Sequence, residues 1–180
     1  MYLTSESTLP TLQSVATIRP RTDGDIAACF QVLDIVYNDS GYPVEGVGDP
    51  AKFFKKDEAA WIAEVDGTVV GHIALAEGTA GNVAVDLWQN EHPEDTQVAV
   101  IGKLFVHPDN RKGGTASRLI STAVREARGR GQRLLMFALI KDQDAIRLYR
   151  KLGWQYFGNA RYKWGEGNEM DAEFFASPMS

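Results

Sequence analysis

Apolar residues along this chain recur at two spacings, and the change from one to the other predicts the order of its elements. A helical spacing is set first by Ile26, Phe30, Leu33 and Tyr37. The stretch "AAWIAEVDGTVVGHIALAEG" then gives two β-rich runs joined by Asp66-Gly67, which predicts a β-hairpin. Residues 79–97 are polar in their second half and mostly aperiodic, and we expect a functional or flexible loop there.

The second half of the chain predicts a strand, a helix, a strand, a helix and two strands, at residues 98–106, 114–129, 133–140, 142–153, 154–157 and 169–175. The run "RLLMFALI" is continuously apolar, as in a strand covered on both faces within a parallel pairing. A short strand at "TIRP" and a weak helix at residues 51–57 complete the order. The pattern predicts an α+β fold, with an antiparallel hairpin early and a β-α-β unit in the middle of a mixed sheet.

Composition narrows the class of protein. At 180 residues, the chain suits a tail or arm at residues 1–16 and one domain at residues 17–180. The net charge of -5 argues against nucleic-acid binding through bulk positive charge. No apolar run is long enough to span a membrane and no signal peptide is visible, so we expect a cytoplasmic protein without a membrane partner. We expect no metal site, and the single Cys29 excludes an internal disulfide.

The stretch "HPDNRKGGTASRLI", residues 107–120, carries the first chemistry. Charged residues and two glycines meet where a strand passes into a helix, and the N–H groups at a helix start bind anions. Neither a Gly-x-Gly-x-x-Gly fingerprint nor a phosphate-binding P-loop is present. The pattern therefore favours an anion site of another kind, and the alternative is a glycine-rich turn that only caps the helix.

Three stretches together resemble the Gcn5-related N-acetyltransferase (GNAT) superfamily. "LFVHPDNRKGGTASRLI" is similar to its acetyl-CoA motif, "DAIRLYRKLGW" to its second motif, and "TIRPRTDGD" to its opening strand. The two motifs stand at the family's usual separation, and the resemblance covers residues 17 to about 175. It implies a central mixed sheet of about six or seven strands flanked by helices.

The resemblance also implies a donor site for acetyl-CoA. The backbone of residues 104–106 would pair with the pantetheine arm as an added strand does, and the turn that follows would hold the pyrophosphate. Tyr149 would act as the general acid for the departing thiolate. Asp142 stands where the family usually has Asn, and lacks the amide donor that Asn offers the cofactor. The implied cofactor-binding residues are Leu104, Phe105, Val106, Arg111, Lys112, Gly113, Gly114, Thr115, Ala116 and Asp142.

The general base is the open point of this prediction. Several family members have a glutamate where this chain has Val100, which cannot accept a proton. The candidates for the base are Asp86, Glu91, His92, Glu45 and His72, with Asp86 and His92 placed first. His72 lies mid-strand, where a structural role is more usual. A base acting through water, or bulk solvent alone, is equally open.

For the acceptor, acidic and aromatic side chains in the two long loops suit a cationic amine, by charge and by cation–π contact. The candidates are Tyr42, Glu45 and Trp88. The leading hypothesis is an acetyl-CoA-dependent N-acetyltransferase that acts on a small-molecule amine or on a protein lysine or N-terminus. The alternative is a non-catalytic acyl-CoA-binding or sensor module, and a homodimer is common in the resembled family.

Overall fold

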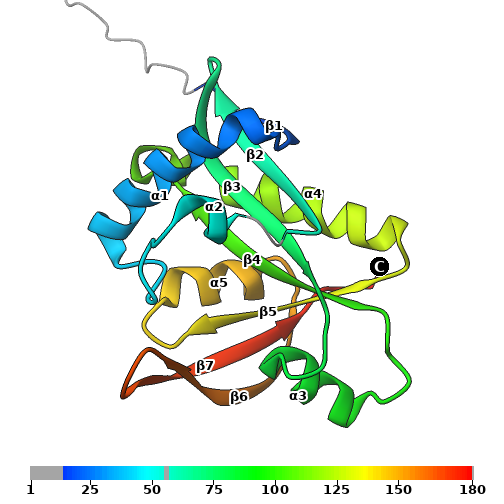
Figure 1. The fold of residues 1–180 in the computed structure, drawn as a ribbon. Coiled ribbons are helices and arrows are strands. Elements are labelled where there is room, and N and C mark those ends of the chain that lie inside the picture. The colour runs from blue at the N-terminus through cyan, green and yellow to red at the C-terminus, as the bar shows by residue number, and fades with distance from the viewer. Residues whose placement is uncertain (1–13, 55–56, 180) are drawn as a thin grey trace, which may run out of the picture.

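A computed structural model describes residues 14–54 and 57–179, and within them seven strands form one sheet (Figure 1). The strands are β1 (Thr17–Pro20), β2 (Ala59–Val65), β3 (Thr68–Glu77), β4 (Val98–Val106), β5 (Arg133–Leu139), β6 (Gln155–Trp164) and β7 (Asn168–Ala176). The helices are α1 (Ile26–Ser40), α2 (Pro50–Phe53), α3 (Val83–Glu91), α4 (Thr115–Gly129) and α5 (Gln143–Lys151), with short 3₁₀ turns η1 (Asp23–Asp25) and η2 (Pro108–Gly113).

The strand order is β1-β2-β3-β4-β5-β7-β6, and every neighbouring pair is antiparallel except β4 and β5. The predicted α+β class, the early hairpin and the parallel pair across the β-α-β unit are confirmed. The hairpin turn has positive φ at both Asp66 (50°) and Gly67 (76°), as the Asp-Gly pair predicts.

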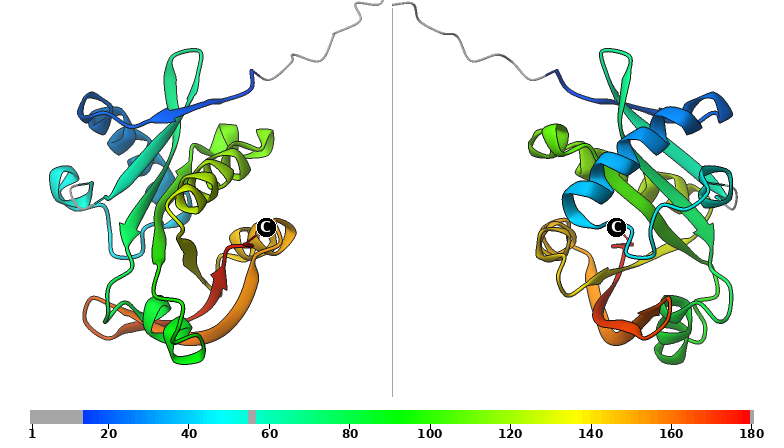
Figure 2. Two further views of the ribbon diagram at one scale, coloured as in Figure 1. Left: turned by 90° about the vertical axis from the view of Figure 1, so that its right-hand side faces the viewer. Right: turned by 60° about the vertical axis from the view of Figure 1, so that its left-hand side comes forward.

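Helices cover both faces of the sheet (Figure 2). α4 and α5 bury Leu119, Ile120 and Tyr149 against one face. On the other face, α1 and α2 pack over β2, β3 and β4, whereas α3 packs over β5, β6 and β7. α5 and the segment after α1 therefore lie on opposite faces of the sheet. Their residues can approach one another only where neighbouring strands are not paired.

The parallel pair makes such a meeting possible, because its strands separate (Figure 1). Residues 98–100 of β4 pair with residues 133–135 of β5, and we call this the paired end. Beyond it, residues 101–106 of β4 stay on β3, while residues 136–139 of β5 stay on β7. We call this half the splayed end, and there no strand among the described residues pairs with the backbone edge of β4 that faces β5.

Three predictions of local structure were wrong. Residues 79–97 contain α3, whose nine residues are too short for a clear periodic signal, although Asn82 caps it by accepting the Ala84 N–H at 3.0 Å. The weak helix is shorter than expected, at Pro50–Phe53. The strand predicted at residues 154–157 runs on to Trp164, since its half-exposed residues give a weak pattern.

The expected tail lies mostly outside the described residues, which begin at Ser14. Of its last residues, Ala16 is 4% exposed and belongs to the core under α4, whereas Val15 is 68% exposed. Among the described residues, no helix is long and apolar enough to cross a membrane.

Candidate functional site

The turn between β4 and α4 exposes the start of a helix. η2 ends at Gly113, and Gly114 then takes a left-handed backbone (φ 76°) as the N-cap of α4. Gly114 has no side chain to accept a bond from the first N–H groups, and the backbone ladder begins with the Arg118 N–H on the Gly114 carbonyl at 3.1 Å. These first N–H groups and the positive end of the helix dipole suit an anion.

The basic side chains of this turn are less available than the sequence suggests. Arg111 donates from Nη1 to Asp39 Oδ2 at 2.8 Å and from Nε to the Val106 carbonyl at 3.2 Å. Its guanidinium therefore ties the turn to α1, whereas Lys112 is exposed. The predicted cradle accordingly rests on backbone N–H groups from Gly113 to Ala116 more than on the charge of Arg111.

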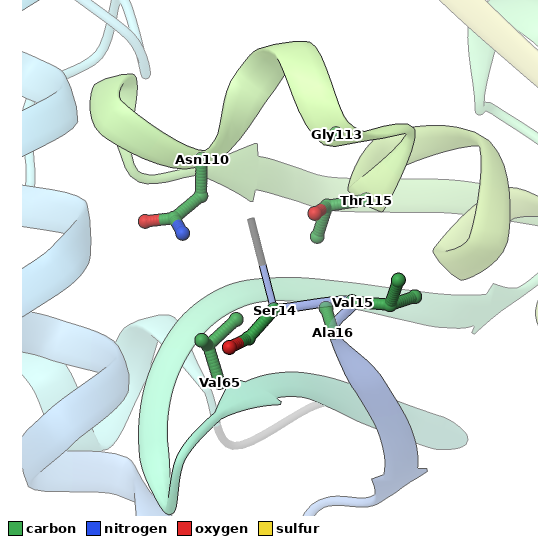
Figure 3. Close-up of a pocket in the computed structure, with 7 residues that line it drawn as sticks. All are labelled: Ser14, Val15, Ala16, Val65, Asn110, Gly113 and Thr115. Carbon is green, nitrogen blue, oxygen red and sulfur yellow. The ribbon is translucent and has the colours of Figure 1, made fainter. Parts of the chain in front are cut away.

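A small hollow lies under the same turn (Figure 3). Ser14, Val15, Ala16 and Val65 form one side, and Asn110, Gly113 and Thr115 form the other. Its volume is about 40 Å³, which holds one or two water molecules. This volume is too small for a whole nucleotide, although Gly113 and Thr115 also belong to the turn predicted to hold the pyrophosphate.

The predicted cofactor strand lies at the splayed end of β4. The side chains of Phe105 and Val106 are buried at 3% and 5% exposure, and Leu104 is half-buried, so all three anchor β4 in the core. Their backbone edge toward β5 is left for another extended chain. An arm with amide groups would complete the pairing as an added strand does.

β4 carries a bulge in the same stretch. The register with β3 shifts between His72 and Ala74, opposite Lys103. Lys103 has a φ of 53°, in the left-handed region that a lysine rarely adopts. Such a backbone costs on the order of 1–3 kcal/mol and persists where surrounding contacts hold it.

Buried polar side chains surround the bulge. Arg21 Nη1 donates to Asp57 Oδ2 at 2.7 Å and to His72 Nε2 at 2.8 Å. Because arginine can only donate, the His72 proton is on Nδ1, which donates to the Lys103 carbonyl at 2.8 Å. Burial, the largest cause, lowers the pKa of His72 to about 4. The geometry thus gives this neutral histidine a structural role.

Tyr149, the predicted general acid, lies on α5 with its ring 1% exposed. Its ring packs edge-on against Trp154, at 4.9 Å between centroids. Its hydroxyl is one of two buried side-chain atoms in the described residues that lack a hydrogen-bond partner, the other being Gln132 Oε1. Burial, with a smaller contribution from Tyr42, raises the pKa of Tyr149 well above its usual range.

Tyr42 comes from the opposite face of the sheet and lies near the other residues of the candidate site. Burial is the largest of the causes that raise the pKa of Tyr42, and the nearby Asp142, Tyr162 and Glu45 raise it further. A hydrogen bond from the Lys103 backbone acts in the other direction. Tyr42 therefore lies within electrostatic range of three other predicted site residues, which come from both faces of the sheet: Glu45, Asp142 and Tyr149.

The remaining predicted residues lie on α3. Trp88 is 1% exposed and donates from Nε1 to Asp95 Oδ2 at 3.0 Å. Its ring stacks on the His92 ring, with 3.8 Å between the ring centroids. His92 also contacts the Trp88 carbonyl at 3.2 Å, at the end of the helix. Asp86 is exposed and accepts the Gly81 N–H at 3.1 Å. These contacts hold α3 together, and none of them joins the group around Tyr42.

Sequence reasoning missed four residues of the site, which are Arg21, Asp57, Lys103 and Tyr162. Tyr162 donates to Glu45 Oε1 and lies on β6, whose pattern was weak. Arg21 and Asp57 stand in polar stretches that look like ordinary surface loops. The one usable signal was Lys103, a charge inside an otherwise apolar strand. In the part of the chain described, no three His, Cys, Asp or Glu side chains group as metal ligands.

Residues 26–154, more than half of the chain, match the model of the acetyltransferase (GNAT) family. The chain therefore belongs to the GNAT acetyltransferase family, which confirms the resemblance and the class of enzyme it implied. An uncharacterized N-acetyltransferase of Methanocaldococcus jannaschii is 31% identical over 103 residues, which make up 56% of this chain and 41% of that relative. The match thus spans less than half the length of that relative.

Solved structures agree on the fold. A ribosomal-protein-alanine N-acetyltransferase from Brucella melitensis has a TM-score of 0.70 at 20% identity, over 89% of this chain and 98% of the other. The Salmonella typhimurium protein yncA, solved with its cofactor acetyl-CoA, scores 0.71 at 17% identity over 93% and 95%. NAA60 of Arabidopsis thaliana, with a bisubstrate analogue, scores 0.68 at 18% identity over 91% and 98%.

Proposed function

We propose that this protein transfers the acetyl group of acetyl-CoA to a primary amine, by direct attack of the amine on the thioester. The observation that carries the proposal is the buried Tyr149 hydroxyl on α5, which has no hydrogen-bond partner among the described residues. α5 lies beside the place where β4 and β5 separate (Figure 1). When bound, acetyl-CoA supplies an activated acyl group and a thiolate leaving group. The chain supplies binding, orientation and proton transfer.

The groups that would bind the coenzyme lie at the start of α4 and along the open edge of β4. The N–H groups at the start of α4 would hold the pyrophosphate, since Gly114 leaves them free of a side-chain cap. The open edge of residues 104–106 would pair with the amides of the pantetheine arm. That arrangement leads the thioester toward Tyr149.

Tyr149 would donate a hydrogen bond to the sulfur as the thiolate departs. Because burial raises its pKa, the phenol stays protonated through the neutral range. A thiol has a pKa of about 8.5, so the thiolate is already a fair leaving group and the contribution of Tyr149 is modest. A backbone N–H of the bulged part of β4 would stabilise the carbonyl oxygen.

The acceptor would enter beside Tyr42, from the face that carries α1 and α2. Glu45 and Asp142 give this place negative charge, and Tyr42 and Tyr162 give it aromatic surface. A cationic amine suits both features. Of the predicted bases, Glu45 is the carboxylate that lies in this group, and we assign it the proton of the amine; one such base contributes about 10²–10⁴-fold.

Release of free thiol from acetyl-CoA tests this function, with polyamines, aminoglycosides, amino acids and lysine peptides as acceptors and a blank without acceptor. We expect turnover with a cationic amine, and a Glu45→Gln variant that loses it most at low pH. Acetyl-CoA binding without turnover across the panel would instead support the sensor hypothesis. Absence of binding would refute the donor site itself.

A further inference from the structure

The backbone of Lys103 is held from the side of β3. Its carbonyl accepts the Nδ1–H of His72 at 2.8 Å, on the side of β3. Its N–H belongs to residues 101–106, the half of β4 that forms the splayed end. One peptide unit of the bulge thus connects a buried polar network to the splayed end.

The side chain of Lys103 is held as well. Its Nζ donates to Asp57 Oδ1, and Asp57 is a carboxylate whose side chain is only 3% exposed. The other oxygen of Asp57 accepts Arg21 Nη1 at 2.7 Å. The Nζ also stands 5.3 Å from the centre of the Phe53 ring. A buried carboxylate shared by two cations holds both of them, because its loss would leave both cations without a counter-charge.

Nothing in the residue type explains the conformation of Lys103. Glycine, asparagine or aspartate would adopt a left-handed backbone readily, and lysine does not. The strand is otherwise extended, and the preceding Gly102 is not among the positive-φ residues. The conformation therefore depends on the contacts of the Lys103 carbonyl and ammonium group.

We propose that Asp57 is a positioning residue for acetyl transfer: by binding the Lys103 ammonium group it holds the β4 bulge so that the Lys103 N–H points to the place where the thioester carbonyl lies. His72 holds the carbonyl of the same peptide from the other side. This inference rests on the proposed function and adds the device that aims its oxyanion donor. Asp57 itself touches neither substrate nor acetyl group.

Asp57→Asn tests the proposal because it removes the charge at nearly constant volume. A misplaced group or a lost oxyanion donor costs about 10²-fold or more in rate, so a loosened bulge should lower kcat about tenfold to a hundredfold. The KM for acetyl-CoA should change less than threefold, since the N–H groups at Gly114 lie elsewhere. Asp95→Asn is the matched control: it breaks the part-buried contact of Asp95 with Arg133 and should leave kcat unchanged.

Variants at Lys103 separate positioning from general stability. Lys103→Met removes the ammonium group and should lower kcat as Asp57→Asn does, with no further loss in the double variant. Lys103→Gly also removes the ammonium group, but glycine adopts φ 53° without strain. It should therefore retain at least several-fold more kcat than Lys103→Met. Equal kcat for the Gly and Met variants, or additive losses in the double variant, would overturn the proposal.

Crystal structures test the positioning role of Asp57 independently of enzyme activity. Crystal structures of the wild type and of Asp57→Asn should show Lys103 leaving the left-handed region in the variant, with the Asp95→Asn structure unchanged there. A positive φ at Lys103 in Asp57→Asn would refute the positioning role whatever the turnover. A wild-type protein that binds acetyl-CoA without turnover would contradict the proposed function and leave this structural test standing.

Discussion

The two ends of the β4–β5 pair differ in how their polar groups are satisfied. At the paired end, the strands bond to each other, and Asp95 accepts both Trp88 Nε1 at 3.0 Å and Arg133 Nε at 3.1 Å. At the splayed end, β4 offers an unpaired backbone edge and Tyr149 offers a buried hydroxyl without a partner. Both ends are well packed, so burial alone does not distinguish them.

The difference separates groups that maintain the fold from groups kept for a ligand. A buried polar group without a partner costs about 1–3 kcal/mol, and native proteins retain few of them. Tyr149 stands beside an open strand edge, where a bound chain can supply its partner. Gln132 Oε1, the other such atom in the described residues, lies just before β5, at the end where β4 and β5 are paired.

The largest effect should follow from a negative charge at the start of α4. Gly114 and Gly131 both have positive φ, of 76° and 69°, and open space where a Cβ would stand. Gly114→Asp should weaken acetyl-CoA binding on the order of a hundredfold, because like charges brought together cost several kcal/mol and 1.4 kcal/mol is tenfold. Titration calorimetry with acetyl-CoA measures the change.

Gly131→Asp is the control for backbone strain. Aspartate tolerates the left-handed backbone, so the two variants should lose similar stability. Gly131 follows α4 near the paired end, and its variant should bind acetyl-CoA normally. Equal loss of affinity in the two variants would mean that the effect comes from folding and not from the anion site.

Removal of the Tyr149 hydroxyl should separate activity from stability. Tyr149→Phe should lower kcat about tenfold, near the lower end of the usual effect of a proton donor, with acetyl-CoA affinity nearly unchanged. Because the hydroxyl is buried without a partner, its loss should raise the free energy of unfolding by about 1 kcal/mol. Thermal unfolding and steady-state kinetics on the same preparation measure both quantities.

Tyr156→Phe is the matched control for this variant. The Tyr156 hydroxyl donates to Asn159 Oδ1 at 2.9 Å, and the residue is 46% exposed. Its loss should leave kcat unchanged and lower stability slightly. A Tyr149→Phe variant with wild-type kcat would remove Tyr149 from the chemistry, and one that is less stable than the wild type would show that its hydroxyl has a partner in the free protein.

Stability should fall with pH through a window set by His72. Its pKa is lowered to about 4 in the fold, against an ordinary value of 6.5, so the unfolded chain takes up the proton first. The contribution is complete above pH 6.5 and is lost as the pH falls toward 4, by up to about 3 kcal/mol. Arg19 lowers the pKa of Asp25, so the stability that Asp25 contributes is lost at a lower pH.

His72→Asn tests the assignment of this pH window to His72, because the asparagine amide can still donate to the Lys103 carbonyl but does not titrate. Urea unfolding between pH 4 and pH 7 should show a flatter profile for His72→Asn than for the wild type. The charged residues that face His72 are Arg21, Asp57 and Lys103. An unchanged slope in the variant would assign the window to another residue.

The predictable parts of the molecule are those whose cause is local. Apolar spacing predicted the strands around Asp66-Gly67 and the helix after Gly114, because each depends on neighbouring residues. The turn before that helix, where the anion site is predicted, was recognisable for the same reason. α3 was missed because its short helix is defined by burial of Trp88 and by the cap at Asn82, more than by a long periodic pattern.

The site beyond that turn depends on contacts between residues far apart in the chain. Asp57 lies 46 positions from Lys103, and Glu45 lies 117 positions from Tyr162. No spacing in the sequence encodes these contacts. Tyr149 was predicted from the family motif, but its unpartnered hydroxyl follows only from the separation of β4 and β5.

The smallest effect concerns Arg111, whose charge the sequence placed in the anion site. Because its guanidinium is bound to Asp39, Arg111→Ala should weaken acetyl-CoA binding less than threefold. The exposed pair should contribute at most about 1 kcal/mol to stability. Asp39→Asn frees the guanidinium without removing it, so its affinity for acetyl-CoA should equal or slightly exceed that of the wild type. A tenfold loss in Arg111→Ala would mean that the side chain leaves Asp39 when the pyrophosphate binds, and that the anion site uses the charge of Arg111 as well as backbone N–H groups.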